Sequence, residues 1–269
     1  MPELPEVETV LRTLEDRIKD ARITGIDVLY APIIEGSVRS FKNKLIGQHF
    51  RSFDRRGKYL IFGMDDISLV SHLRMEGKYY ILGKDDPLDK HTHVVFHLDD
   101  GRQLRYHDVR KFGRMELIPK ADDYSVFKEL GPEPFGREFS LKYCKEYLEG
   151  KKKPFKEVLL DQSFVAGIGN IYADEILWDI RVNPLRSASK LNDEEIKDLI
   201  ASTRKILRKA IKAGGTTIRS YTSSLGVTGR FQLSLNCHTV ETCRRCGNDI
   251  KKIRVGGRGT YYCPSCQKK

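Results

Sequence analysis

The chain has 269 residues, with 48 basic and 37 acidic side chains and a formal net charge of +11. A hydrophobic fraction of 39% excludes a collagen-like, low-complexity or wholly disordered chain, and the length predicts two domains, with room for a small appendage. No apolar run approaches the roughly 18 residues of a membrane helix. Residues 1–8 are acidic where a signal peptide is basic, so we expect a cytoplasmic protein.

The first half of the chain predicts one helix followed by a β-rich region. Residues 5–19 carry apolar side chains at helical spacing. Short strand-like runs separated by Asp- and Gly-containing turns follow at 23–30, 50–53, 59–63, 68–73, 78–82, 93–98, 103–106 and 113–118. Their regular spacing predicts an antiparallel β-sandwich or barrel.

The second half predicts helices and then a small C-terminal module. A Gly-Pro-Glu-Pro linker at 131–134 ends the β pattern. Helices are expected at 141–149, 154–160, 170–179 and 193–213, the last beginning at an Asn192/Asp193 cap and stopping at Gly214-Gly215. A Gly/Ser/Thr-rich loop is expected at 214–229. We therefore predict an α+β protein with domains 1–131, 132–230 and 231–269.

The positive charge is concentrated at the C-terminal end. Residues 230–269 hold nine basic and two acidic side chains, which is +7 of the total +11. A compact excess of this kind favours binding to a polyanion, most simply nucleic acid. The alternative is a solubilising tail, but four of the six cysteines lie in the same segment.

These four cysteines form two Cys-x-x-Cys pairs: Cys243 and Cys246, then Cys263 and Cys266. Two such pairs supply the four thiolates of a tetrahedral Zn²⁺ site, whereas a pair of disulfides is disfavoured in a cytosolic chain. We expect one structural zinc, because a module of this size has no core of its own. It should hold a hairpin with Arg258 at its tip, and Cys144 and Cys237 should be packing residues.

The N-terminus is a candidate nucleophile. Pro2 follows Met1, and removal of Met1 would leave a secondary amine whose ordinary pKa, near 8, keeps more of it neutral than a lysine. Glu3 and Glu6 lie within one helical turn and are suited to proton transfer. Taken alone, a proline and acidic residues are also an ordinary helix start.

The chain as a whole resembles the formamidopyrimidine-DNA glycosylases, which are 8-oxoguanine-DNA glycosylase/AP lyases. The resemblance rests on motifs that occur in the family's order over nearly the whole chain. They are Pro-Glu-Leu-Pro-Glu-Val-Glu-Thr at 2–9, Arg-Gly-Lys-Tyr-Leu at 56–60, Ser-His-Leu-Arg-Met at 71–75, Asp-Val-Arg-Lys-Phe-Gly at 108–113, Gly-Ile-Gly-Asn-Ile-Tyr at 167–172 and the four-cysteine finger.

The resemblance implies a bifunctional enzyme of base excision repair that acts on double-stranded DNA containing oxidised purines or abasic sites. Pro2 would attack C1′ of the damaged nucleotide and form a Schiff base, and β,δ-elimination would follow. Glu3 would protonate the sugar ring oxygen, Glu6 would orient the amine, and Lys58 would contact the lesion phosphate. The protein would act as a monomer in the bacterial cytoplasm, at the nucleoid.

The resemblance also implies the residues that hold the DNA. Met75, Arg110 and Phe112 would fill the gap left by the extruded base, since flipping a nucleotide costs a few kcal/mol of stacking and pairing. Read without the family, Met75 and Phe112 would be core residues. Asn170, at the start of a helix in a helix–two-turn–helix element, and Arg258 would bind phosphates. His91 would be a further phosphate contact, and loop 214–229 would cap the lesion.

Two stretches depart from the family pattern. Leu-Asn-Cys-His-Thr at 235–239 stands where relatives usually have a Val-Tyr-Gly-basic stretch, and Tyr261 replaces a frequent histidine. These positions bear on how the finger packs.

Two other functions remain as alternatives. One is the endonuclease VIII branch, which favours oxidised pyrimidines but typically lacks the Arg110–Phe112 pair and the long loop. The other is a zinc-ribbon DNA-binding protein without activity.

Overall fold

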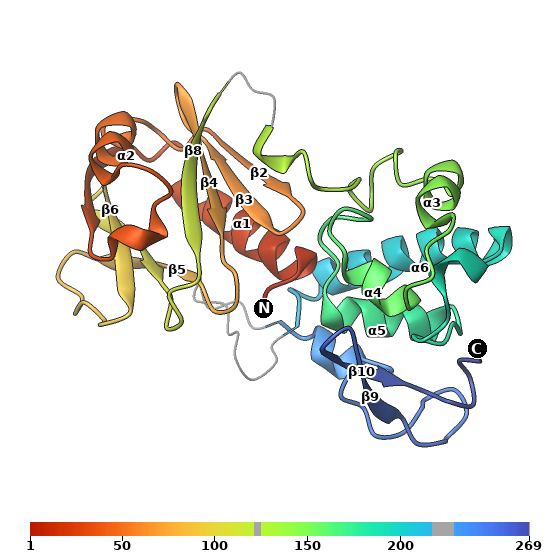
Figure 1. The fold of residues 1–269 in the computed structure, drawn as a ribbon. Coiled ribbons are helices and arrows are strands. Elements are labelled where there is room, and N and C mark those ends of the chain that lie inside the picture. Colours follow the sequence, from red (N-terminus) through yellow and green to blue (C-terminus); the bar gives the residue numbers. More distant parts are fainter. Residues whose placement is uncertain (121–124, 217–228, 269) are drawn as a thin grey trace. The chain divides into compact units, whose positions relative to one another are not determined.

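The computed structural model describes residues 1–120, 125–216 and 229–268 (Figure 1). The chain forms two compact units, one of Met1–Val126 with Gly214–Gly229 and one of Phe127–Ala213 with Arg230–Lys269. The predicted division into three domains stays a prediction. Most of the predicted capping loop, 217–228, lies outside the described residues.

The first unit begins with helix α1 (Leu4–Ile18). Its apolar face is buried at Val7, Val10, Leu11, Leu14 and Ile18, which recur at the spacing that places side chains on one side of a helix. At its N-terminus, the Glu3 backbone N–H donates to Oε2 of Glu6 at 2.9 Å, and this satisfies one of the donors left open at a helix start.

The strands of this unit form two four-stranded antiparallel sheets, with orders β1-β6-β7-β5 and β2-β3-β4-β8. Their bounds are β1 Ile23–Val28, β2 Ser52–Arg56, β3 Tyr59–Gly63, β4 Ile67–His72, β5 Lys78–Gly83, β6 Thr92–Leu98, β7 Arg102–His107 and β8 Arg114–Pro119. Side chains from both sheets and from α1 form one hydrophobic core, as in a β-sandwich. The predicted strands are confirmed, within a few residues at each end.

Helix α2 (Val38–Leu45) is not among the predicted elements. Ser37 caps it, with its side chain accepting from the Ser40 N–H at 3.3 Å. Only Phe41 and Leu45 of this helix are buried, so the sequence offers too few apolar positions for the helical period to be recognised.

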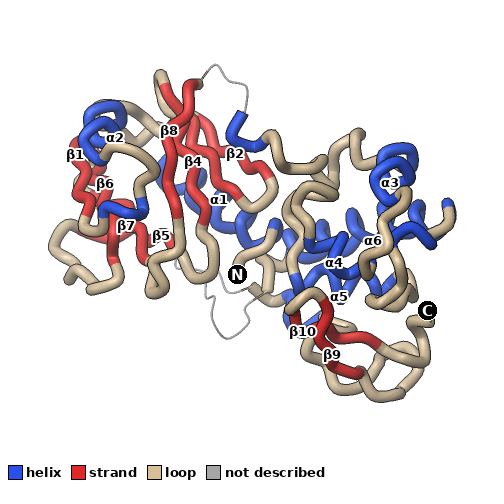
Figure 2. Tube along the Cα trace, in the orientation of Figure 1, coloured by secondary structure: helices blue, strands red, loops and turns tan. Residues whose placement is uncertain are grey.

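The second unit is helical, with strand only at a C-terminal hairpin among its described residues (Figure 2). Its helices are α3 Leu141–Leu148, α4 Phe155–Leu160, α5 Asn170–Asp179 and α6 Asp193–Lys212, and its strands are β9 Lys251–Val255 and β10 Arg258–Tyr262. Short 3-10 helices lie at Ala31–Ile33, Ser125–Phe127, Ala188–Lys190 and Phe231–Ser234. As predicted, Asn192 caps α6, and the helix ends just before Gly214.

The fold class is therefore the predicted one: an antiparallel β-sandwich with an N-terminal helix, followed by helices and a β-hairpin. The hairpin turn is Gly256-Gly257, with φ of 54° and 76°, the left-handed conformations that a two-residue turn of this type requires. Arg258 is thus the first residue of β10 and follows the tip. No helix within the described residues is long and apolar enough to span a membrane.

Candidate functional site

The predicted catalytic residues of the first unit lie close together at the start of α1. Pro2 is buried, and Glu3, Glu6 and Lys58 are 2%, 4% and 6% exposed. Charged side chains are seldom buried to this extent unless they are paired or hydrogen-bonded. Burial of a proline and two carboxylates at one helix start, with a lysine of the β2–β3 turn buried as well, is more than capping requires.

The N-terminal amine, which the full chain carries on Met1, lies within the electrostatic reach of these groups. Burial lowers its pKa; Glu3 and Glu6 act in the opposite direction, and Lys58 acts with burial. The net effect is a lowered pKa of the Met1 amine, so these surroundings favour its neutral form.

Glu6 links the start of α1 to the first residues of loop 214–229. Its Oε2 accepts from the Glu3 N–H at 2.9 Å, and its Oε1 accepts from the backbone N–H and hydroxyl of Thr216 at 2.7 and 3.0 Å. A Cβ at Gly215 would lie 2.8 Å from Oε1, so the close approach requires glycine. The Glu6 carboxylate is thereby fixed in orientation beside Pro2 and Glu3.

Lys58 is placed by the tight β2–β3 hairpin. Gly57, with φ of 56°, turns the chain between the paired residues Arg56 and Tyr59. The Arg55 guanidinium donates to the Gly57 carbonyl and to Oε2 of Glu8, both at 2.9 Å. Because Glu8 belongs to α1, Arg55 connects the turn that carries Lys58 to the helix that follows Pro2.

The residues predicted to enter the DNA lie on two turns of the same unit. Met75 is half-buried after β4, and Arg110 and Phe112 are exposed between β7 and β8. The Arg110 guanidinium carbon lies 4.7 Å from the centre of the Phe112 ring, a cation–π distance. The structure therefore excludes Phe112 as a core residue, because it is 48% exposed.

Two histidines of the first unit, His72 and His91, lie at the ends of its strands. His72, at the end of β4, is buried next to the Tyr59 ring, and burial, with Arg74 and Lys58, lowers its pKa to about 3. It was not singled out from the sequence, although it lies within the Ser-His-Leu-Arg-Met motif. His91 is half-buried before β6, and its ring centre lies 5.5 Å from that of His107.

The second unit places Asn170 against the finger hairpin. Asn170 is the first residue of α5, its Nδ2 donates to the Gly259 carbonyl at 2.8 Å, and its Oδ1 has no partner among the described residues. Arg258, next to Gly259, is exposed. A helix N-terminus and an arginine held beside it form an arrangement that suits a phosphate.

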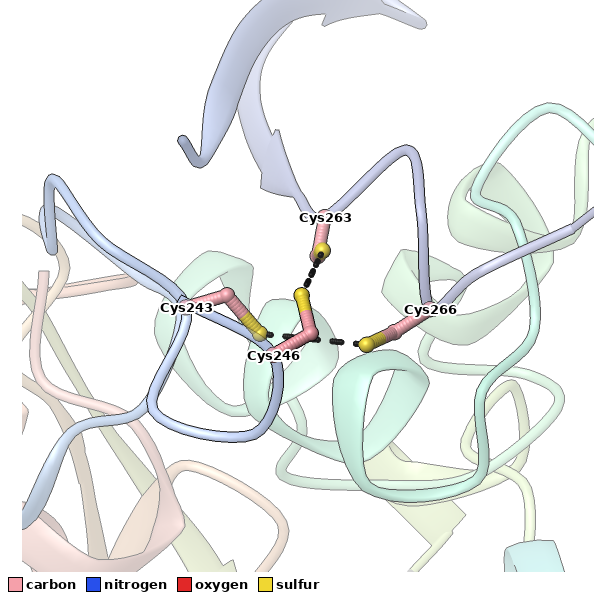
Figure 3. Close-up of side chains that lie close together, drawn as sticks. All are labelled: Cys243, Cys246, Cys263 and Cys266. Carbon is pink, nitrogen blue, oxygen red and sulfur yellow. Dashed lines mark hydrogen bonds between the residues drawn. The ribbon is translucent and has the colours of Figure 1, made fainter. Parts of the chain in front are cut away.

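The four cysteines converge as the spacing predicts (Figure 3). All four Sγ atoms lie within 4.8 Å of one another, with Cys243–Cys266 at 3.9 Å and Cys246–Cys263 at 3.5 Å, and none forms a disulfide. Tetrahedral zinc with Zn–S bonds of about 2.3 Å separates its sulfurs by about 3.8 Å, so the site fits zinc. The Trp178 indole N–H donates to the Cys243 sulfur at 3.2 Å, which supports its thiolate form.

The stretch that departs from the family pattern packs on buried acids of α5. Backbone N–H groups of Asn236, Cys237 and His238 donate to the Glu175 carboxylate at 2.8–3.2 Å. Asp174 accepts from the Tyr261 N–H at 3.2 Å and is paired with Nδ1 of His238 at 2.7 Å. Asn236–His238 and Tyr261 thus anchor the finger to α5 rather than leaving it loose.

The predicted site residues fall into two groups. The first unit brings together Pro2, Glu3, Glu6 and Lys58 and carries Met75, His91, Arg110 and Phe112. The second unit brings Asn170 and Arg258 together beside the four-cysteine cluster. The first group can supply an amine, proton donors and apolar wedges. The second can bind phosphates.

Comparison with known proteins covers nearly the whole chain. Residues 1–115 match the formamidopyrimidine-DNA glycosylase N-terminal domain, and residues 130–222 match the helix–two-turn–helix domain of the same enzymes. Residues 241–269 match a zinc finger found in these glycosylases and in isoleucyl-tRNA synthetases. With the sulfur geometry, this match shows that the four cysteines bind one structural zinc.

Individual relatives are similar over their full length. The formamidopyrimidine-DNA glycosylase of Streptococcus mutans is 48% identical over 273 residues, covering 100% of both chains. A Lactococcus lactis protein solved with Fapy-dG-containing DNA has a TM-score of 0.94 and 45% identity, with 100% of both chains covered. The Lactococcus lactis protein solved with abasic-site DNA also has a TM-score of 0.94, at 46% identity, covering 99% of this chain and 100% of that one.

Proposed function

Because the chain belongs to the formamidopyrimidine-DNA glycosylase family, we propose that it starts the repair of oxidised purines through the amine of Pro2. The chain is a DNA glycosylase of base excision repair, and the family typically adds AP lyase activity. The observation that carries the Pro2 role is the burial of Pro2 at the start of α1 together with the charged side chains of Glu3, Glu6 and Lys58.

The chemistry requires Met1 to be removed. The neutral Pro2 nitrogen then attacks C1′, the bond from C1′ to the base breaks, and the base leaves with its electron pair and takes up a proton. Glu3 protonates the sugar ring oxygen, the ring opens, and the nitrogen loses its proton to form an iminium with C1′. Glu6, held by Thr216 and by the Glu3 N–H, orients the amine for this attack.

Strand cleavage follows from the same iminium. The cation acidifies the proton on C2′, so removal of that proton expels the 3′ phosphate, and a second elimination expels the 5′ phosphate. Water then hydrolyses the imine and regenerates the Pro2 amine. Lys58, fixed by the hairpin turn at Gly57, binds the lesion phosphate and keeps C1′ within reach of the amine.

DNA binding is divided between the two units. Met75, Arg110 and Phe112 occupy the gap left by the flipped nucleotide, where an exposed aromatic ring under a guanidinium is suited to stacking beside the orphaned base. His91, Asn170 and Arg258 bind phosphates, and the zinc holds Arg258 in place. We propose that the protein acts as a monomer on duplex DNA in the bacterial cytoplasm, at the nucleoid.

Borohydride trapping tests the proposal. The purified protein is mixed with a duplex containing 8-oxoguanine and reduced, and a covalent protein–DNA adduct is expected. Pro2→Gly should abolish the adduct, whereas Arg39→Ala, at an exposed position of α2, should leave it unchanged. Absence of an adduct with protein shown by mass to begin at Pro2 would refute the Schiff-base mechanism.

A further inference from the structure

We infer that Asp108 and Tyr106 are positioning residues that hold the DNA-inserting side chains Met75, Arg110 and Phe112 in one fixed arrangement. The inference deepens the proposed function and rests on the gap-filling role proposed there. Both residues are fully buried, at 0% exposure. Both lie in the first unit.

The Asp108 carboxylate organises the turn that carries Arg110 and Phe112. Its Oδ1 accepts from the Arg110 N–H at 3.0 Å, and its Oδ2 accepts from the N–H groups of Phe112 and Gly113 at 2.9 and 2.8 Å. Three backbone donors of one six-residue segment thus point at one buried side chain. A buried carboxylate is tolerated when such donors replace its water, and it fixes the backbone that supplies them.

The Tyr106 hydroxyl connects this turn to the turn that carries Met75. It lies 3.4 Å from Oδ2 of Asp108. A Cβ at Gly113 would lie 1.6 Å from the Tyr106 hydroxyl oxygen, and a Cβ at Gly77 would lie 2.4 Å from the same hydroxyl oxygen. Gly77 closes the Met75 turn, since its N–H donates to the Leu73 carbonyl at 2.9 Å. One hydroxyl is therefore packed between both turns, and both glycines are needed to make room for it.

The main chain of Asp108 connects the turn that carries Arg110 and Phe112 to His91 and His93. Its N–H donates to the His91 carbonyl at 3.0 Å, and its carbonyl is hydrogen-bonded to Nε2 of His93 at 2.8 Å. The position of His91, the proposed phosphate contact, is thus tied to the residue that also holds Arg110 and Phe112.

Each of the two turns contains a residue with a positive φ, a backbone conformation that residues other than glycine rarely adopt. Arg74, before Met75, has φ of 52°, and Lys111, between Arg110 and Phe112, has φ of 59°. Such residues persist where the surroundings overdetermine the backbone, and they cluster at functional sites. Hydrogen bonds to Asp108 and packing around Tyr106 supply that constraint, so exposed side chains can be presented without first having to become ordered.

The test separates base extrusion from the chemistry of the amine. Asp108→Asn replaces one acceptor oxygen with a donating NH₂ and should slow single-turnover excision of 8-oxoguanine from a duplex by about 10²-fold. It should also reduce the fluorescence increase of 2-aminopurine placed beside the lesion. Trapping on a single strand with a preformed abasic site, where no base pair has to be opened, should stay within about threefold of wild type.

Two further variants complete the test. Tyr106→Phe, which keeps the ring and removes only the hydroxyl, should slow duplex excision by about tenfold and spare single-strand trapping. Asp100→Asn is the matched control, because the Asp100 carboxylate accepts from the Arg102 N–H at 3.0 Å in the unrelated β6–β7 turn.

Each outcome decides one question. Wild-type excision and 2-aminopurine signals in Asp108→Asn and Tyr106→Phe would overturn the inference. So would an equal loss of excision and single-strand trapping in a variant that circular dichroism shows to be folded, because the residue would then act on the chemistry of the amine and not on base extrusion. Should Asp108→Asn fail to fold, Tyr106→Phe alone decides. Failure of the wild-type protein to form any adduct would instead refute the proposed function.

Discussion

Removal of the Arg258 guanidinium should change the salt dependence of DNA binding by an amount that the structure defines. Arg258 is exposed at the start of β10, makes no ion pair within the described residues, and lies next to Gly259, which Asn170 holds at 2.8 Å. If it contacts one phosphate, Arg258→Ala should reduce the slope of log K against log salt by about 0.9. Between 50 and 200 mM salt, the affinity difference between wild type and variant should therefore shrink about 3.5-fold.

Fluorescence anisotropy with a duplex carrying a stable abasic-site analogue measures this slope over a series of salt concentrations. Arg39→Ala removes the same charge from an exposed position of α2, so it controls for the change in net charge. An Arg258→Ala slope equal to that of wild type or of Arg39→Ala would refute the phosphate contact. A change well above 0.9 would mean that the hairpin as a whole had shifted.

Three other perturbations test the fold and the site. Chelation of zinc should weaken DNA binding while the first unit keeps its circular dichroism, and global loss of structure would contradict independent folding of that unit. Leu11→Ala, at 0% exposure in α1, should lower the free energy of unfolding by about 2–5 kcal/mol in urea titrations, and a cost below 1 kcal/mol would contradict its core position. Burial lowers the pKa of His72 to about 3, whereas the ordinary pKa of a histidine, near 6.5, applies in the unfolded chain. Between these two pH values the unfolded chain therefore binds a proton at His72 and the folded chain does not. Stability should fall by up to about 1.4 kcal/mol per pH unit between pH 6.5 and 3, more steeply than in His72→Gln; equal slopes would contradict a buried neutral imidazole.

The elements that the sequence predicted well are those whose pattern is local. The period of Val7, Val10 and Leu11 and the cap at Asn192 define α1 and α6 without reference to the rest of the chain. The two Cys-x-x-Cys pairs likewise define their own geometry, and the four sulfurs meet as expected. Helix α2 was missed because its formation depends on tertiary burial of Phe41 and Leu45 and only weakly on its own sequence.

The site was predictable as a set of residues but not as a set of contacts. Without the family motifs, Phe112 would be assigned to the core, because apolar residues near strands usually are buried, yet it is 48% exposed. The link from Glu6 to Thr216 spans 210 positions in the chain, and no local pattern reports such a pairing. The same holds for Tyr106, whose hydroxyl meets two turns distant from each other in sequence.

The atypical stretch at 236–238 shows a further limit of motif comparison. Its side chains differ from those usual in relatives, but its contacts with Glu175 are made by backbone N–H groups, which any residue other than proline supplies. The departure therefore leaves the attachment of the finger to α5 intact. His238 adds a contact to Asp174 that the sequence alone did not predict.

The most direct test of the Pro2 mechanism is the mass of the trapped N-terminal peptide. Protein reduced with borohydride on 8-oxoguanine duplex is digested with nuclease and protease, and the modified peptide is sequenced by mass spectrometry. We predict a peptide that lacks Met1 and carries the reduced sugar fragment on the nitrogen of Pro2. A fragment attached to Lys58 or to another lysine, or an active protein that retains Met1, would contradict the account.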